Sequence, residues 1–414
     1  YGIHSIIIAI PTLKGSKLSH VIDLCVSTHC AVQLLSDPQL VGSGAPQQGA
    51  FRELNPADFL SRDEVTLDTD QISGYLTGKT VLVTGGGGSI GSELCRQVMR
   101  FKPGKLLIFD IYENCAYELL MELQQKYGRN IPVTVLVGSI RDKKRLDEVF
   151  ETYHPTVVFH AAAHKHVPLM EVSPAEAVKN NVLGTKNLLV SASEHDVERF
   201  VQLSTDKAVN PTSVMGCTKR ICEMLIQTFA GNTDMKCVAV RFGNVLGSHG
   251  SVIPLFEAQI KKGGPVTLTD PNIERYFMTI PEAAQLVLQA GALAESGNIY
   301  VLDMGEPVKI MDLAKQLIRF YGYEPGVNME IKIVGLRPGE KLYEELMMDE
   351  EQDKMRRTQH NKIFVASPRS IDLAEFYGQL QELAAAAEHN DEGVVQQLAK
   401  MIPTFTPTRQ NLKL

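Results

Sequence analysis

A short polar turn, Thr205-Asp206-Lys207, follows the apolar run at residues 200–203, with one serine between them. It brings together a hydroxyl, a carboxyl and an amine, which are groups of the kinds that transfer protons in enzymes. In an open α/β sheet the carboxyl ends of the strands face the ligand crevice, so we expect this turn where chemistry takes place. The alternative interpretation is a salt bridge that ends a strand.

A glycine-rich loop at residues 85–91 lies between a predicted strand and a predicted helix. Gly85, Gly88 and Gly91 follow a GxxGxxG spacing, which lets the backbone approach a pyrophosphate that the helix amides would bind. The next strand ends in Asp110, whose carboxylate can accept both ribose hydroxyls and would repel a 2′-phosphate. The pattern therefore predicts NAD rather than NADP, against the alternative of a flexible loop with an ordinary surface aspartate.

The elements that must position these residues are apolar runs that alternate with helical stretches, at residues 81–83, 106–109, 133–137, 157–159, 200–203 and 238–240. Continuously apolar strands separated by helices are typical of a parallel sheet that is covered on both faces. We therefore predict an α/β fold: a doubly wound parallel sheet, the NAD-binding Rossmann fold, with a smaller C-terminal substrate lobe.

The expected domain limits follow from where this rhythm starts and stops. They are a partial N-terminal α/β module at 1–40, a linker and lead-in at 41–76, an NAD-binding domain at 77–245 with a return segment at 280–303, a substrate-binding lobe at 246–279 and 304–365, and a helical tail at 366–414. The first apolar run resembles the middle of an element, so we expect the natural N-terminus to be missing.

Composition excludes several classes of protein. The chain has 414 residues and a net charge of -7, from 41 Lys and Arg against 48 Asp and Glu, which argues against a nucleic-acid-binding surface. Its seven cysteines form no CxxC pair, which indicates reduced thiols and no structural zinc. The apolar runs are too short to span a bilayer.

Three histidines, His160, His164 and His166, form an HxxxHxH pattern. The pattern can indicate a metal site, but Lys165 between the last two disfavours a cation, so we expect no metal and instead residues that line a cofactor or substrate.

Six motifs, in chain order, carry a resemblance to a known family over about residues 50–365: TGGGGSIGS, HAAAHKHVP, STDKAVNPTSVMGCTKR, RFGNVLGS, RYFMTIPEA and LRPGEKLYEEL. Together they resemble the extended short-chain dehydrogenase/reductase (SDR) superfamily, specifically the nucleotide-sugar 4,6-dehydratases of the CapD-like polysaccharide-biosynthesis group. Residues 1–40 also resemble the end of the module that precedes the catalytic domain in long, membrane-anchored members.

The resemblance implies a division of labour in the active site. Asp206 would be the acid and Lys207 the base of a dehydration in which NAD is recycled, and Lys219 would bind the nicotinamide ribose. The superfamily's usual tyrosine is replaced by Met215, whose thioether cannot move a proton. The group that deprotonates the C4 hydroxyl therefore stays open, with Thr205, through water, or Asp206 as candidates.

The resemblance also implies binding residues. Those expected to contact NAD are Gly85, Gly88, Ser89, Ile90, Gly91, Asp110, Ser139, Ile140, Ala162 and Lys219. Ser139 stands where the family has a carboxylate for the adenine amine, so that contact is lost. Residues expected at the UDP-sugar are Lys165, Asn244, Arg275 and Arg337, the last three on the diphosphate, and Glu340 on the uridine ribose.

The expected function is an NAD-dependent UDP-N-acetylglucosamine 4,6-dehydratase, a lyase that serves a bacterial surface glycan. The alternatives are a UDP-sugar 4-epimerase and a non-catalytic NAD-binding scaffold. By resemblance, the full-length protein would be anchored at the cytoplasmic face of the cell membrane and would form a homo-oligomer. The sugar, the stereochemistry at C5, the oligomeric state and the pathway stay open.

Overall fold

The computed structural model describes residues 2–10, 13, 15–26, 28, 30–35, 51–55, 58, 65–366, 371–390 and 392–407. Outside the described residues lie 36–40 at the end of the expected N-terminal module, 41–50, 56–57 and 59–64 of the expected linker, and 367–370, 391 and 408–414 of the expected tail. The chain forms two compact units. Unit 1 comprises Tyr1–Val65, Asn244–Ile280 and Met304–Leu336, and unit 2 comprises Thr66–Gly243, Pro281–Asp303 and Arg337–Leu414. The domain limits expected from the sequence stay a prediction.

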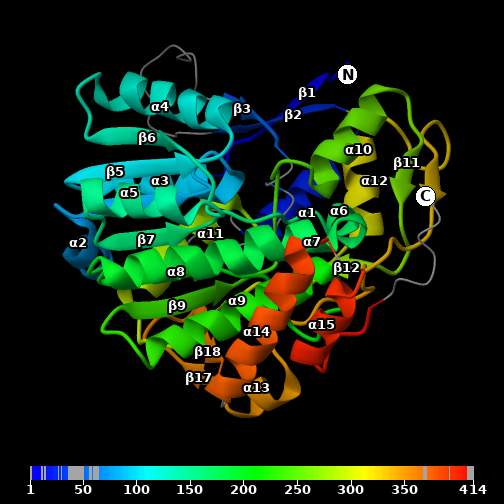
Figure 1. Cartoon of the computed structure of the whole chain (residues 1–414). Helices are drawn as coiled ribbons and strands as arrows, with labels where there is room; N and C mark the ends of the chain where they lie inside the picture. The colour runs from blue at the N-terminus through cyan, green and yellow to red at the C-terminus, as the bar shows by residue number, and fades with distance from the viewer. Residues whose placement is uncertain are drawn as a thin grey trace. The chain divides into compact units, whose positions relative to one another are not determined.

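Unit 2 is built on a nine-stranded sheet in the order β17-β18-β14-β9-β8-β7-β4-β5-β6 (Figure 1). The strands from β14 to β6 in this order run parallel, and β18 and β17 extend the other edge antiparallel. The bounds are β4 Thr80–Thr84, β5 Lys105–Asp110, β6 Val133–Val137, β7 Val157–His160, β8 Arg199–Leu203, β9 Lys236–Arg241, β14 Ile299–Leu302, β17 Arg356–Arg357 and β18 Ile363–Ala366.

The order of the first six parallel strands is that of a Rossmann fold. In chain order, β6-β5-β4-β7-β8-β9 reads 3-2-1-4-5-6, so the strand order reverses between β4 and β7. Ligands of such sheets bind beyond the carboxyl ends of the strands at this point. The predicted fold class is therefore confirmed.

Helices connect the parallel strands of unit 2, and α5, α8 and α9 pack on one face of the sheet (Figure 1). Central side chains such as Leu82, Phe159 and Phe200 are fully buried, as expected for strands covered on both sides. The helices are α2 Thr69–Leu76, α3 Ser89–Arg100, α4 Glu113–Tyr127, α5 Lys143–Tyr153, α6 Val167–Val172, α7 Pro174–Ala177, α8 Gly184–Glu194, α9 Val214–Ala230, α11 Ile280–Ala292 and α13 Asp349–Asp353, with a π-helix at Val178–Leu183.

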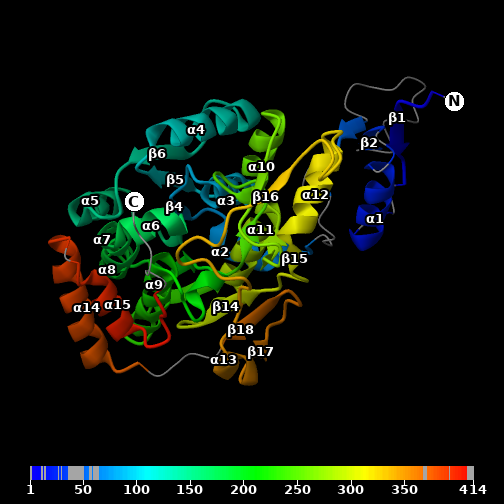
Figure 2. The ribbon, with the colours of Figure 1, turned by 90° about the vertical axis from the view of Figure 1, so that its right-hand side faces the viewer.

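The C-terminal helices α14, Leu373–Glu388, and α15, Val394–Met401, belong to the same core. Both views show them beside α9 (Figures 1 and 2). Leu383 and Leu398 are fully buried in the cluster that also holds Ile221 of α9. The end of the chain therefore helps to hold the helix that carries Met215 and Lys219.

Unit 1 contains two clusters of apolar side chains. The first joins β1, Ser5–Ile8, β2, Ala31–Leu35, and β3, Phe51–Glu53, to helix α1, Gly15–Val26, and Phe320 packs against it. The second lies between α10, Val252–Lys261, and α12, Ile310–Phe320, with the short strands β10 Asn244–Val245, β11 Val266–Leu268, β12 Glu274–Arg275, β13 Phe277–Met278, β15 Val308–Lys309 and β16 Ile331–Ile333.

Within the described ranges, no helix combines the length and the apolar character needed to cross a membrane.

Candidate active site

The glycine-rich loop joins β4 to helix α3, which begins at Ser89 with Gly88 as its N-cap. A Cβ on Gly91 would clash with the carbonyl oxygen of Gly85, so the loop can approach the helix this closely only with glycine at position 91. The backbone of Ala162 lies against Gly85 from the loop after β7. A tight turn into the positive end of a helix fits the pyrophosphate of a dinucleotide.

Asp110 lies beside this loop at the end of β5. Its Oδ2 accepts a hydrogen bond from the Gly87 amide at 2.8 Å, and its Oδ1 accepts one from the Tyr112 amide at 2.9 Å. The carboxylate is thus held where the loop turns, which fits a ribose diol. Half-buried Ile90 lies in the first turn of α3.

Ser139 and Ile140 follow β6, the strand next to β5. The Ser139 hydroxyl accepts a hydrogen bond from the Arg141 amide at 3.2 Å, so it closes its own turn. Ile140 is 4% exposed and packs against Gly184 of α8. Contacts of both residues with adenine stay a prediction.

The polar turn after β8 is a 3-10 turn at Asp206–Ala208. The Asp206 carboxylate is completely buried, and its Oδ1 accepts hydrogen bonds from the Thr205 hydroxyl at 2.8 Å and from the Lys207 ammonium at 2.9 Å. The Lys207 side chain is 21% exposed. The three groups therefore form one hydrogen-bonded chain at the carboxyl end of β8, two strands from β4.

Helix α9 begins next to this turn, with Ser213 as its N-cap. Met215 and Lys219 are one helical turn apart and therefore share a face. They are 4% and 7% exposed. Burial lowers the pKa of Lys219. Their placement on one face is what the replaced tyrosine and lysine pair would require, but their roles stay predictions.

The histidine pattern does not form one site. His160 is buried, and its two ring nitrogens lie 2.7 Å from the Thr84 hydroxyl and 2.9 Å from the Thr185 hydroxyl. Burial lowers the pKa of His160 to about 3, and the charge of Lys219 adds to this effect. The expectation that His160 lines a ligand is wrong, because the core hydroxyls already take both ring nitrogens.

The residues expected at the UDP-sugar fall in both units. Arg337 and Glu340 of unit 2 bind each other through Nη2 and Oε1 at 3.0 Å. Lys165, also of unit 2, is exposed overall. The protein around its amine still removes part of the hydration, which lowers the pKa of Lys165. Arg275 of unit 1 is 8% exposed and Asn244 is half-buried. Their substrate contacts stay predictions.

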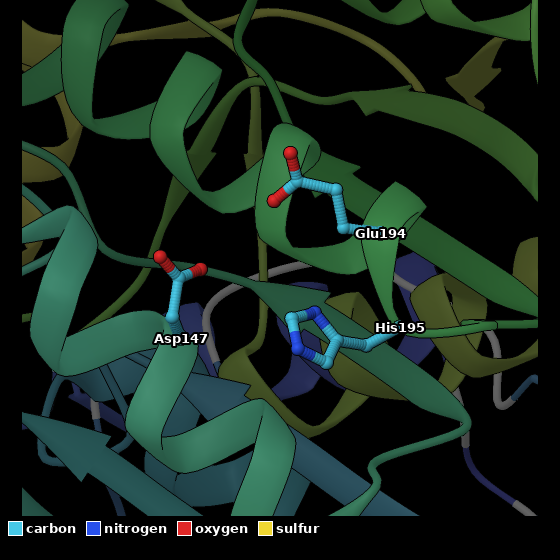
Figure 3. Close-up of side chains that lie close together, drawn as sticks. All are labelled: Asp147, Glu194 and His195. Carbon is cyan, nitrogen blue, oxygen red and sulfur yellow. The ribbon is translucent and has the colours of Figure 1, made fainter.

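One group of potential metal ligands occurs in the described part of the chain: Asp147 on α5, Glu194 at the end of α8, and His195 (Figure 3). The Lys143 ammonium bridges the two carboxylates, at 2.5 Å from Asp147 and 3.0 Å from Glu194. The Lys143 ammonium thus already offsets one of the two negative charges.

Sequence reasoning missed one group at the polar turn after β8. The Glu344 carboxylate is 4% exposed, and its Oε1 lies 3.7 Å from the Lys207 ammonium. The available signal was the motif LRPGEKLYEEL, which contains Glu344 as well as Arg337 and Glu340.

Comparison with known proteins places the chain in a family. The family model described as "Polysaccharide biosynthesis protein" matches residues 81–368. The chain belongs to this family. Capsular polysaccharide biosynthesis protein CapD of Staphylococcus aureus is 53% identical over 84% of this chain and 58% of its own length. The chain thus spans less than two thirds of that relative.

Other relatives carry more specific names. A UDP-glucose 4-epimerase of Rickettsia rickettsii is 34% identical over 81% of this chain and 98% of its own length. A UDP-N-acetylglucosamine 4,6-dehydratase (inverting) of Campylobacter jejuni is 33% identical over 64% of this chain and 76% of its own length. The solved structure of Pen from Bacillus thuringiensis, at 34% identity, superposes with a TM-score of 0.66 over 71% of this chain and 90% of its own.

Proposed function

We propose that this chain is the catalytic part of an NAD-dependent UDP-N-acetylglucosamine 4,6-dehydratase that serves synthesis of a bacterial surface polysaccharide. The observation that carries the proposal is the buried, hydrogen-bonded chain Thr205-Asp206-Lys207 at the carboxyl end of β8. A dehydration needs a base for the C5 proton and an acid for O6, and a 4-epimerization needs neither of these. The C. jejuni relative named for this activity supports the choice.

The cofactor site would be formed by Gly85, Gly88, Gly91, Asp110 and Lys219. The chemistry that bound NAD supplies is acceptance of hydride from C4 of the sugar and its return to C6. A ketone at C4 acidifies the hydrogen on C5, which makes elimination across C5 and C6 feasible.

The chain's own residues then move the protons. Neutral Lys207 takes the C5 proton and returns it to C5 at the end of the reaction. Protonated Asp206 gives its proton to O6, which leaves as water. The O4 proton leaves in the first step, while Asp206 still holds its own, so it passes through the Thr205 hydroxyl to water. Asp206 regains a proton from water, through the same hydroxyl 2.8 Å from its Oδ1, after O6 has left. This route needs no tyrosine at position 215.

The reaction needs protonated Asp206 and neutral Lys207, a state that differs from the Asp206–Lys207 ion pair by the transfer of one proton. Asp206 and Lys207 are joined by a 2.9 Å hydrogen bond in a site where the carboxylate is fully buried. A buried pair loses much of the hydration that stabilises its charges, so the neutral pair becomes accessible.

Product analysis tests the proposal. After incubation with UDP-N-acetylglucosamine, mass spectrometry should show the loss of one water, and deuterium placed on C4 should appear on C6. An unchanged mass with a new sugar signal would identify the 4-epimerase, which the R. rickettsii relative keeps as the second candidate. No change would identify a scaffold.

The variant Lys207→Ala tests the assignment of Lys207 as the base. It should still bind NAD, because Lys207 lies outside the expected cofactor contacts, and it should lose dehydration by roughly a hundredfold or more. Normal turnover in this variant would contradict the assigned base. Membrane anchoring of the longer protein and homo-oligomerisation stay predictions.

A further inference from the structure

The segment at residues 337–346 lies along the proposed catalytic turn, Thr205-Asp206-Lys207, within unit 2. The Thr212 hydroxyl donates to the Gly339 carbonyl at 3.1 Å, and the Lys341 ammonium donates to the Val209 carbonyl at 3.0 Å. A Cβ on Gly339, which has a φ of +77°, would meet the Cβ of the neighbouring N-cap serine at 2.8 Å. The segment can therefore lie this close to the turn only with glycine at position 339.

The far end of the segment is also fixed. The Arg241 guanidinium donates to the Leu346 carbonyl at 2.9 Å, and the Met348 amide donates to the Glu351 carboxylate at 3.0 Å. Arg241 in turn binds Glu351 at 2.8 Å, and both side chains are buried. Glu344 lies between these two anchored ends, so the backbone that carries its side chain is fixed on both sides.

The Lys207 ammonium faces two buried carboxylates. Asp206, on its own turn, lies 2.9 Å away, and Glu344, on the overlying segment, lies 3.7 Å away. The next charges along the segment, Lys341 and Glu345, bind each other at 3.1 Å. The amine of Lys207 thus lies near two buried carboxyl groups.

We infer that Glu344 is a positioning residue for Lys207, the permanent counter-ion that keeps its amine aligned and stabilises its charge while Asp206 is protonated. The inference rests on the proposed function. Asp206 must carry a proton to release O6 as water, so in that state it offers Lys207 no negative charge. When Lys207 takes the C5 proton, the new ammonium needs an anion nearby, because a buried charge without a partner is costly. Glu344 supplies that anion in every protonation state of Asp206.

Glu344→Gln tests the assignment. We expect kcat to fall roughly tenfold to a hundredfold, because the amine loses its alignment, with the KM for the UDP-sugar changed by less than about threefold. The acidic limb of the pH profile of kcat should move down by about one pH unit, because protonated Lys207 loses an opposite charge. Glu344→Asp, which keeps the charge, should restore the wild-type pH profile and part of kcat.

Glu345→Gln is the matched control. Its carboxylate is 47% exposed and binds Lys341, so the same change in charge one residue away should leave kcat and the pH profile unchanged. Thermal unfolding and NAD binding of each variant check that the fold is kept.

The outcomes separate the inference from the proposed function. Wild-type kcat and pH profile in Glu344→Gln would overturn the inference, and so would equal losses in the Gln and Asp variants with an unmoved pH profile. If the wild-type protein releases no water, the proposed function fails. In that case, NMR titration of the ¹³C-methylated lysines measures the effect of Glu344 on Lys207, and Lys207→Ala assigns the signal. A lower midpoint for Lys207 in Glu344→Gln supports the counter-ion, and an unchanged midpoint refutes it.

Discussion

The carbonyl oxygen of Gly85 occupies the space that any side chain at position 91 would need. The glycine at the start of α3 is therefore a steric requirement of the turn that we expect to hold the pyrophosphate. Position 74, on helix α2, offers the opposite case, because a Cβ there would meet nothing within 4 Å.

We predict that Gly91→Ala lowers the affinity for NAD by more than about tenfold, because the loop must move away from the helix amides. Gly74→Ala should leave NAD binding unchanged and stabilise the fold by roughly 0.5–1 kcal/mol, since alanine loses less backbone entropy in a helix. Calorimetric titration with NAD and thermal unfolding measure both effects. Equal NAD affinity in the two variants would contradict the assignment of the loop.

At the scale of residues, the sequence predicted those features of the site that depend only on neighbouring residues. The glycine loop and the turn at Asp206 and Lys207 are continuous in the chain, so residue type and spacing were sufficient. Glu344 was missed because its contact with Lys207 depends on how a distant segment folds back. His160 was misinterpreted because no pattern shows that Thr84 and Thr185 reach its ring in the core.

At the scale of elements, a buried cluster of charges joins β9, α9 and α13. Arg241 on β9 binds Glu223 of α9 and Glu351 of α13, each at 2.8 Å, and Glu223 also accepts the Ser204 hydroxyl at 2.7 Å. Ser204 immediately precedes the proposed catalytic turn. The cluster therefore links the turn, the helix that carries Lys219 and the end of the segment that carries Glu344. The charged run at residues 349–357 does not reveal from the sequence that Glu351 is buried, because charge alone does not show a buried partner.

We predict that Glu351→Gln destabilises unit 2 by about 3–5 kcal/mol, since it leaves Arg241 in the core with one carboxylate fewer. Asp353→Asn, on the exposed side of the same helix, removes the same charge and should cost less than about 0.5 kcal/mol. Urea unfolding measures both values. A similar free energy of unfolding for the two variants would show that the cluster contributes little.

The same cluster predicts an acid-dependent loss of stability. Burial alone would raise the pKa of Glu223, but Arg241 and Arg220 outweigh it and lower the pKa from 4.5 to about 2. The carboxylate's contribution is therefore complete above the unfolded value of 4.5 and is lost as the pH falls toward 2. Between about pH 5 and pH 3 the wild type should lose more unfolding free energy than Glu223→Gln. Parallel curves from urea unfolding across this range would contradict the assignment.

At the scale of the whole molecule, unit 2 is assembled from distant parts of the chain. Strand β14 comes from the return segment and β18 from beyond residue 337, yet both extend the sheet that begins with β4. The alternation of strands and helices predicted the parallel part of this sheet. The packing of the tail on α9 depends on which apolar helix faces meet, and periodicity does not specify that.

We predict that a chain ending at residue 370 is poorly folded, because it lacks α14 and α15 and exposes the apolar face of α9, including Val214 and Ile221. It should bind a hydrophobic dye and unfold at a markedly lower temperature. A chain ending at residue 407 keeps Phe405 and the rest of this cluster, so it should match the full chain. Equal melting temperatures for the two truncations would contradict a structural role of the tail.

The sheet of unit 2 has a consequence for biosynthesis. Strands β4 to β9 are translated before the neighbours of β9 on its outer side, β14 and β18, and before the helices α14 and α15 that cover α9. Until these later elements are made, the nascent chain therefore carries an open strand edge and an uncovered apolar helix, which are features that promote aggregation. Production of this protein should consequently respond to chaperone supply and to slower translation.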